Sequence, residues 1–162
     1  MSENTILEKV NGLWFYGLAG SGKTYASKFV SQRIMRPFIV DGDAVRKHVS
    51  IDLGYSQAER NIQTLRIFGI GYIALENGMF PIMSSVTMTN DLLKSCQNLS
   101  ISVVRIDRPF EHVKAVRDLY DGQKNVVGVD QSLQKLNTLA LVNDGTENFD
   151  RELVGYATGI TA

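Results

Sequence analysis

The stretch Gly17-Leu18-Ala19-Gly20-Ser21-Gly22-Lys23-Thr24 is the most informative about the fold, because it matches the pattern GxxxxGK[ST] in full. It follows the apolar run Leu13-Trp14-Phe15-Tyr16, so a predicted strand precedes the loop and a predicted helix follows it, as this pattern requires. The glycines allow consecutive backbone N–H groups to surround phosphate oxygens, the lysine reaches the β- and γ-phosphates, and the threonine hydroxyl ligates Mg²⁺. We therefore expect a polyphosphate to be bound by Gly17, Ala19, Gly20, Ser21, Gly22, Lys23 and Thr24.

Length and composition indicate one domain over residues 1–162, because a chain of this size with 44% hydrophobic residues can bury a single core. The 17 basic and 17 acidic side chains cancel, so we expect no nucleic-acid or membrane partner and a small-molecule substrate instead. Cys96 is the only cysteine, which excludes a disulfide framework and a cysteine zinc site. The polar residues 1–11 lack the apolar core of a signal peptide, and we expect a cytoplasmic protein.

Strands and helices alternate along the chain, a pattern typical of a parallel sheet with helices on both faces. Strands are predicted at 13–16, 38–40, 80–86, 101–106 and 139–142, and helices at 23–35, 57–77, 90–97, 110–119 and 149–156. Ser56 is suited to begin the second of these helices and Gly78 to end it. The expected class is α/β, a P-loop fold with a mostly parallel five-stranded sheet, and residues 120–137 are expected to form a lid-like loop.

Two carboxylates, Asp41 and Asp43, follow the second predicted strand. This is the edge at which open α/β sheets place ligands. Asp43, with Asp41 as the second choice, is therefore a candidate to accept a proton from an attacking hydroxyl or to hold water on Mg²⁺. The alternative is that the acidic pair caps the next helix, because Asp is common at such positions.

The run Asp41-Gly42-Asp43-Ala44-Val45-Arg46, followed by Asp52-Leu53-Gly54-Tyr55-Ser56 and Arg60, resembles the DGDxxR and DLGF/YSxxxR segments of adenylylsulfate kinases. Together with the P-loop and the later pair Arg117-Asp118, the resemblance covers most of residues 12–130. It implies transfer of the γ-phosphoryl group of ATP to a ribose 3′-hydroxyl, with Mg²⁺ as cofactor and a possible homodimer. Lys23 and Asp43 would then be catalytic, and Thr24 and Asp43 would hold the metal.

The resemblance also assigns the remaining candidate residues. Arg117 and Asp118 match a pair that lies near the base of ATP, the alternative being a solvent-facing charge pair. Arg46 and Arg60 would clamp the phosphate groups of the acceptor, since a planar guanidinium binds phosphate in a bidentate manner. Surface arginines without a ligand are the alternative. The acceptor-binding residues implied in this way are Asp41, Arg46, Tyr55, Arg60, Gln63, Thr87 and Val126.

The chain departs from the family pattern on the acceptor side. The lid is several residues shorter, Val126 stands where a phenylalanine would stack on adenine, Ser85 also replaces a phenylalanine, and Gln63 replaces an asparagine. These changes predict a retained reaction on a different acceptor. A divergent branch of the family, found with bacterial capsule phosphoramidate pathways, phosphorylates cytidine diphosphoramidate, which is the expected acceptor here. Adenylylsulfate is the alternative acceptor, and a non-catalytic nucleotide-binding module or a P-loop kinase for a sugar or nucleoside also stays open.

Overall fold

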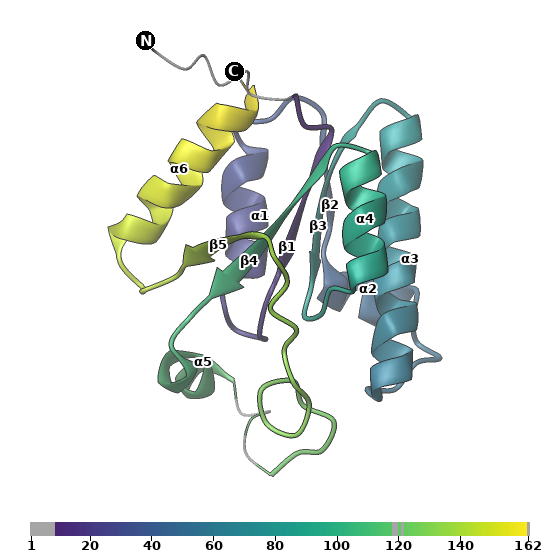
Figure 1. Ribbon diagram of the computed structural model, residues 1–162, viewed down its shortest axis with the longest axis vertical. Helices are drawn as coiled ribbons and strands as arrows, with labels where there is room; N and C mark the ends of the chain where they lie inside the picture. Colours follow the sequence, from purple (N-terminus) through teal and green to yellow (C-terminus); the bar gives the residue numbers. More distant parts are fainter. Residues whose placement is uncertain (1–8, 118–119, 121, 162) are drawn as a thin grey trace.

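The computed structural model describes residues 9–117, 120 and 122–161, and a five-stranded sheet in the order β2-β3-β1-β4-β5 forms its centre (Figure 1). Its neighbouring strands all pair in parallel, which confirms the predicted α/β class. The strands are β1 Gly12–Tyr16, β2 Pro37–Val40, β3 Phe80–Ser85, β4 Ile101–Asp107 and β5 Leu139–Val142.

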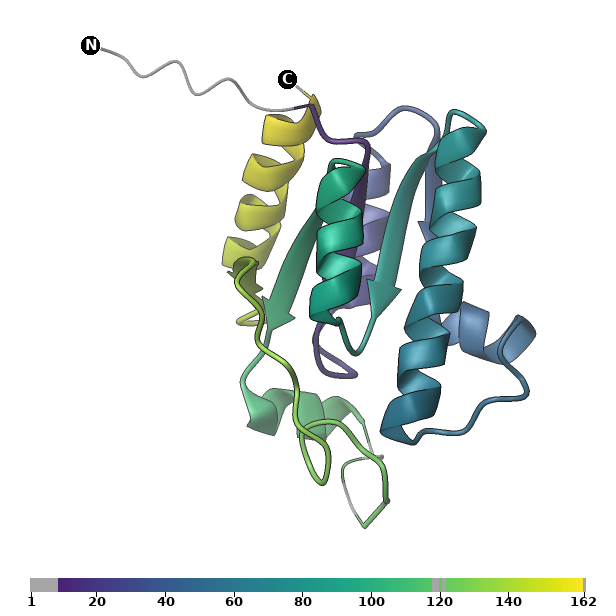
Figure 2. The ribbon, with the colours of Figure 1, turned by 45° about the vertical axis from the view of Figure 1, so that its right-hand side comes forward.

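Helices cover both faces of the sheet. Figures 1 and 2 show α1 and α6 on one face and α3 and α4 on the other. The helices are α1 Lys23–Ser31, α2 Gly42–His48, α3 Gln57–Glu76, α4 Asn90–Asn98, α5 Phe110–Val116 and α6 Glu147–Thr161. Within the described residues, no helix is long and apolar enough to cross a membrane.

The central strand β1 connects two hydrophobic cores. Its side chains point alternately to the two faces, as strand geometry requires. Leu13 and Phe15 pack with residues of α1 and α6, whereas Trp14 and Tyr16 pack with residues of α2, α3 and α4. All four side chains are fully buried. A strand buried on both faces carries an uninterrupted apolar run, and this run precedes the phosphate-binding loop directly.

Helix α3 lies within one residue of its predicted range because both of its ends carry local signals. Ser56 accepts a hydrogen bond from the backbone N–H of Glu59, whose carboxylate accepts one from the N–H of Ser56, forming a capping box. After the helix, Gly78 adopts a left-handed conformation with φ of 69°, which glycine reaches at little steric cost.

Other boundaries differ from the predictions. Helix α1 ends at Ser31 rather than at residue 35, because the chain turns at Arg36 (φ 53°) to enter β2 at Pro37. The short helix α2 was not predicted as an element of its own. Helix α6 extends the predicted 149–156 to Glu147–Thr161. Helix α5 ends at Val116, and residues 118–119 of the predicted helix lie outside the described residues.

Candidate active site

A cavity of about 380 Å³ lies at the carboxyl ends of the strands, where the P-loop faces the turn between β2 and α2. Figure 1 shows α5 and the 122–137 loop at this same edge of the sheet. Most of the predicted site residues line the cavity: Ala19, Gly20, Gly22, Lys23, Thr24, Asp41, Asp43, Arg46, Tyr55, Arg60, Gln63, Thr87 and Arg117. Three predicted residues do not line it, namely Gly17, Ser21 and Val126, and Asp118 lies outside the described residues.

The P-loop has the backbone geometry that its glycines predict. Gly20 and Gly22 have φ values of 83° and 106°, in the region that favours glycine. Helix α1 begins directly after Gly22 and no side chain caps it, so its first N–H groups are available to an anion, which the helix dipole also attracts. Ser21 is fully buried beneath the loop, and its N–H donates to Leu18 O.

Lys23 is held against the loop by its ammonium group. Its Nζ donates to Gly17 O at 2.9 Å and to Leu18 O at 2.7 Å. Burial lowers the pKa of Lys23 from 10.5 to about 8, an effect that the carboxylates of Asp43 and Asp41 oppose and the nearby Arg117 reinforces. The lysine therefore lies between the loop and both carboxylates of the acidic turn.

The two carboxylates of the acidic turn have different roles in the fold. Asp41 caps α2, because its Oδ1 accepts from the N–H of Asp43 at 2.8 Å and of Ala44 at 3.4 Å. Its Oδ2 accepts from the Thr24 hydroxyl at 2.6 Å. The capping alternative thus applies to Asp41, and the carboxylate beside Thr24 is that of Asp41 rather than Asp43. Asp43 lines the cavity one helical position further on.

The donor set at Thr24 suits Mg²⁺, which binds hard oxygen ligands and is often held by one or two carboxylates together with substrate phosphates. A hydroxyl and a carboxylate meet here at hydrogen-bond distance and both line the cavity. The described part of the chain contains no group of three or more His, Cys, Asp or Glu side chains that would hold a metal on its own. A metal here would therefore depend on phosphate oxygens of the ligand.

Elsewhere in the cavity lining, two arginines lie close to one aromatic ring. The guanidinium carbons of Arg46 and Arg60 lie 4.7 Å and 5.4 Å from the centroid of the Tyr55 ring, which is 55% exposed. Arg46 donates to Gly54 O at 2.7 Å, and Arg60 donates to Tyr55 O at 3.1 Å and to Asn125 O at 2.6 Å. These arginines are held in place by hydrogen bonds and are not free surface groups.

The deep wall of the cavity presents a hydrogen-bond acceptor. Gln63 donates through Nε2 to Gly42 O at 2.9 Å, and this bond orients the amide. Its Oε1 is buried and has no partner among the described residues. Beside it, the Thr64 hydroxyl donates to Arg60 O and lies 3.4 Å from the Thr87 hydroxyl. A buried carbonyl without a partner favours a ligand that brings a donor, because an unpaired acceptor is costly.

Sequence reasoning missed the contribution of Trp14 to this wall. Its indole N–H donates to Ser85 Oγ at 2.8 Å, and the Ser85 hydroxyl donates to Thr87 O at 2.6 Å. The serine that stands in place of a phenylalanine therefore links the core to Thr87. Only the proximity of β1 and β3 brings these residues together, so no local pattern indicates the contact.

The position of Val126 corrects the prediction that it frames the acceptor base. Val126 is 5% exposed and packs with Val113 and Tyr120 against Leu18 and Ala19, outside the cavity lining. Its burial follows from a tight turn, in which Asp130 accepts from the N–H of Asn125 at 2.7 Å and of Val126 at 2.6 Å. Tyr55 is then the only ring on the acceptor side among the described residues that line the cavity. Gln131 also donates to Tyr55 O, so the loop contacts the site beside this ring.

The parallel sheet, the P-loop and the cavity at its carboxyl edge define a protein of the P-loop fold class. The family model described as adenylylsulphate kinase matches residues 9–135, and the chain belongs to this family. The adenylyl-sulfate kinase of Synechococcus sp. (strain JA-3-3Ab) is 34% identical over 79 residues, 46% of this chain and 45% of that protein. The bifunctional enzyme NodQ of Rhizobium sp. (strain N33) is 30% identical over 136 residues, 72% of this chain and 20% of NodQ.

Solved structures agree with the fold. The APS kinase CysC of Mycobacterium tuberculosis, in complex with AMPPNP and APS, matches with a TM-score of 0.81 at 20% identity, over 95% of this chain and 99% of that chain. This likeness establishes the fold. The sequence matches cover less than half the length of the two curated relatives.

Proposed function

We propose that this chain transfers the γ-phosphoryl group of ATP to the 3′-hydroxyl of the ribose of a nucleotide. The observation that carries the proposal is that one cavity joins the P-loop to the arginine pair around Tyr55, with the acidic turn between them. Phosphoryl transfer depends on positioning and on neutralisation of charge more than on covalent chemistry. A cavity with cationic groups on both sides of a carboxylate turn meets those two needs.

The donor side is assigned from the P-loop geometry. The loop N–H groups and Lys23 bind the phosphates of ATP, and the family resemblance assigns Arg117 to its base. Thr24 and Asp41 would hold Mg²⁺, which when bound neutralises the charge that develops on the phosphate oxygens. Asp43 lines the cavity between the two substrates and is the group assigned to accept the proton of the attacking hydroxyl.

The acceptor side is assigned to the opposite wall. Arg46 and Arg60 bind the phosphate groups of the acceptor, Tyr55 stacks on its base, and Gln63 Oε1 accepts a hydrogen bond from it. Cytidine diphosphoramidate is the first candidate acceptor. One aromatic ring is enough to stack on its small base, whereas a purine would gain more contact from a second ring on its other face. Adenylylsulfate is the second candidate, and it is favoured by the names of the relatives.

Phosphorus NMR of mixtures with ATP, Mg²⁺ and each acceptor tests the proposal. We expect a new 3′-phosphate signal with one of the two nucleotides and none with the Lys23→Ala variant. ATP binding without any transfer would instead support the non-catalytic module, and transfer to a sugar or nucleoside that lacks 5′-phosphates would support a different kinase. Either result overturns the proposal. The cytoplasmic location and the homodimer stay predictions.

A further inference from the structure

Three side chains from outside the P-loop hold three consecutive carbonyls of the loop. The Tyr120 hydroxyl donates to Ala19 O at 2.6 Å. Arg108 Nη1 donates to Gly20 O at 2.9 Å, and Asn143 Nδ2 donates to Ser21 O at 2.8 Å. Since Lys23 takes the carbonyls of Gly17 and Leu18, every carbonyl from residue 17 to residue 21 accepts a side-chain hydrogen bond.

The direction of these carbonyls matters because a peptide unit is planar and its C=O and N–H groups point in opposite directions. Holding the Ala19 and Ser21 carbonyls away from the phosphate site turns the N–H groups of Gly20 and Gly22, which belong to the same peptides, toward it. The N–H of the Gly20–Ser21 peptide donates to Leu18 O instead, so Arg108 braces the turn inside the loop. The glycines of the loop would otherwise allow these peptides to rotate, since glycine loses more conformational freedom on ordering than any other residue. A loop that is already ordered before the ligand arrives binds it more tightly than a flexible loop, because less conformational entropy is lost on binding.

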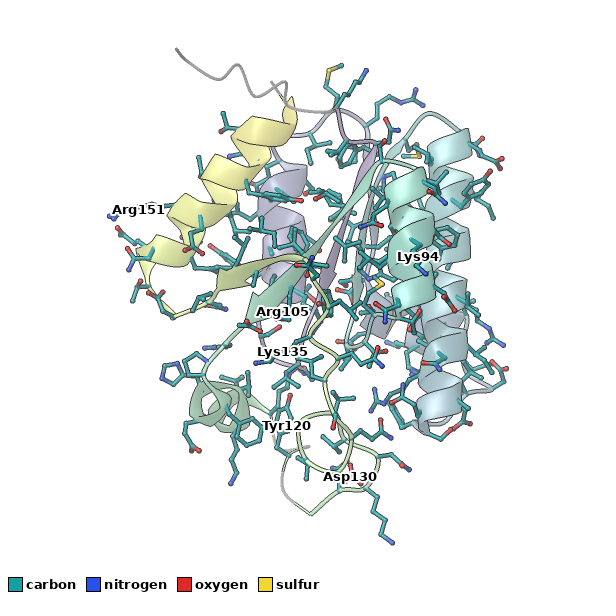
Figure 3. All side chains as sticks on the ribbon, viewed as in Figure 1. Lys94, Arg105, Tyr120, Asp130, Lys135 and Arg151 are labelled. Atoms are coloured by element: carbon teal, nitrogen blue, oxygen red, sulfur yellow. The ribbon has the colours of Figure 1, made fainter. Side chains whose placement is uncertain are left out.

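The three donors come from separate parts of the fold. Arg108 follows β4 and Asn143 follows β5, whereas Tyr120 lies beyond α5. Figure 3 shows the Tyr120 side chain between α5 and the 122–137 loop. The parallel order of β1, β4 and β5 brings their carboxyl ends together behind the P-loop.

Two of these donors, Tyr120 and Asn143, are buried and fixed in orientation. Tyr120 is 5% exposed and its ring packs edge-on against Phe110. The amide of Asn143 is oriented because its Oδ1 accepts from the N–H of Gly145 at 3.1 Å. A Cβ at Gly22 would lie 2.5 Å from Asn143 Nδ2, so the glycine is also needed for this side chain to approach the loop.

We propose that Arg108, Tyr120 and Asn143 are positioning residues, which hold the P-loop in its phosphate-binding conformation without contacting the ligand. The inference rests on the proposed function only in taking ATP as the ligand. The GxxxxGK[ST] pattern contains none of these residues. Their removal weakens ATP binding and leaves acceptor binding unchanged, since the hydrogen bonds that these side chains donate go to the P-loop.

The test compares two matched tyrosine variants. Tyr120→Phe removes the hydroxyl that binds Ala19 O, and Tyr156→Phe removes a hydroxyl that binds Ser102 at the amino end of β4, away from the site. Calorimetry with ATP and Mg²⁺ should give a Kd about three- to tenfold higher for Tyr120→Phe, as expected for one lost hydrogen bond. The control should bind ATP like wild type.

A second variant keeps the test decisive if Tyr120→Phe fails to fold. Arg108→Met should also raise the Kd and the KM for ATP about three- to tenfold, with the KM for the acceptor unchanged, and Arg108→Lys should restore part of the loss. Binding of ATP within about twofold of wild type by Arg108→Met, and also by Tyr120→Phe where that variant folds, overturns the inference. A wild-type protein that binds ATP but phosphorylates no acceptor refutes the proposed function alone.

Discussion

The buried ammonium group of Lys23 makes ATP binding depend on pH in the alkaline range. Its pKa of about 8 lies well below 10.5, because the side chain is withdrawn from water. With that value the protonated fraction of Lys23 falls about 25-fold between about pH 7.5 and about pH 9.5. If only the ammonium form binds the phosphates, the affinity for ATP falls by the same factor, and an unperturbed lysine would give almost no change.

The same titration has the opposite effect on folding. The unfolded chain keeps a lysine pKa near 10.5, so between about pH 8 and about pH 10.5 the unfolded state binds a proton that the folded state has released. The contribution of Lys23 to the free energy of unfolding therefore rises with pH in this range. Loss of ATP affinity and gain of stability in one interval is a combination that general alkaline denaturation does not produce.

Calorimetric titration with ATP and Mg²⁺ across this range measures the first effect, and urea unfolding without nucleotide measures the second. Lys23→Met is the matched control, since it keeps the apolar stem and removes the titrating group. The affinity of Lys23→Met for ATP should be low and nearly independent of pH. The free energy of unfolding of the wild type, measured relative to that of Lys23→Met, should rise with pH over the same range. An affinity of the wild type that stays constant up to about pH 9.5 would refute the reasoning.

Three further changes test the site and its scaffold. Asp41→Asn keeps an oxygen to cap α2 but loses the carboxylate beside Thr24, so we expect stability within about 0.5 kcal/mol of wild type and a higher Mg²⁺ requirement for turnover. Ser56→Ala breaks the capping box of α3 and should cost about 1 kcal/mol in urea unfolding, with a change below about 0.3 kcal/mol counting against the cap. Val126→Phe should destabilise by about 1–3 kcal/mol, because it overpacks a buried cluster. An unchanged Tm would mean that the cluster has room for a ring.

Elements with local signals were predicted well. The ends of α3 are marked by Ser56, Glu59 and Gly78, whose hydrogen bonds and backbone conformation involve residues close in sequence. Helix α2 has seven residues and its local signal is the cap residue Asp41, whose carboxylate equally suits a ligand site, so the sequence does not predict it as a separate element. Val126 shows the limit of reasoning from a resemblance, since its burial depends on how the 122–137 loop folds against α5 and the P-loop.

The phosphate-binding loop, the strand before it and the helix after it can be inferred from the order of residues, because they depend on interactions within a few positions. Tertiary structure places Asp41 against Thr24 and Trp14 against Ser85, and it turns Val126 away from the cavity. It also brought three donors to the loop from residues 88 to 122 positions away in the chain. Such contacts follow from the order of strands in the sheet and the packing of loops at its edge, which no local pattern encodes.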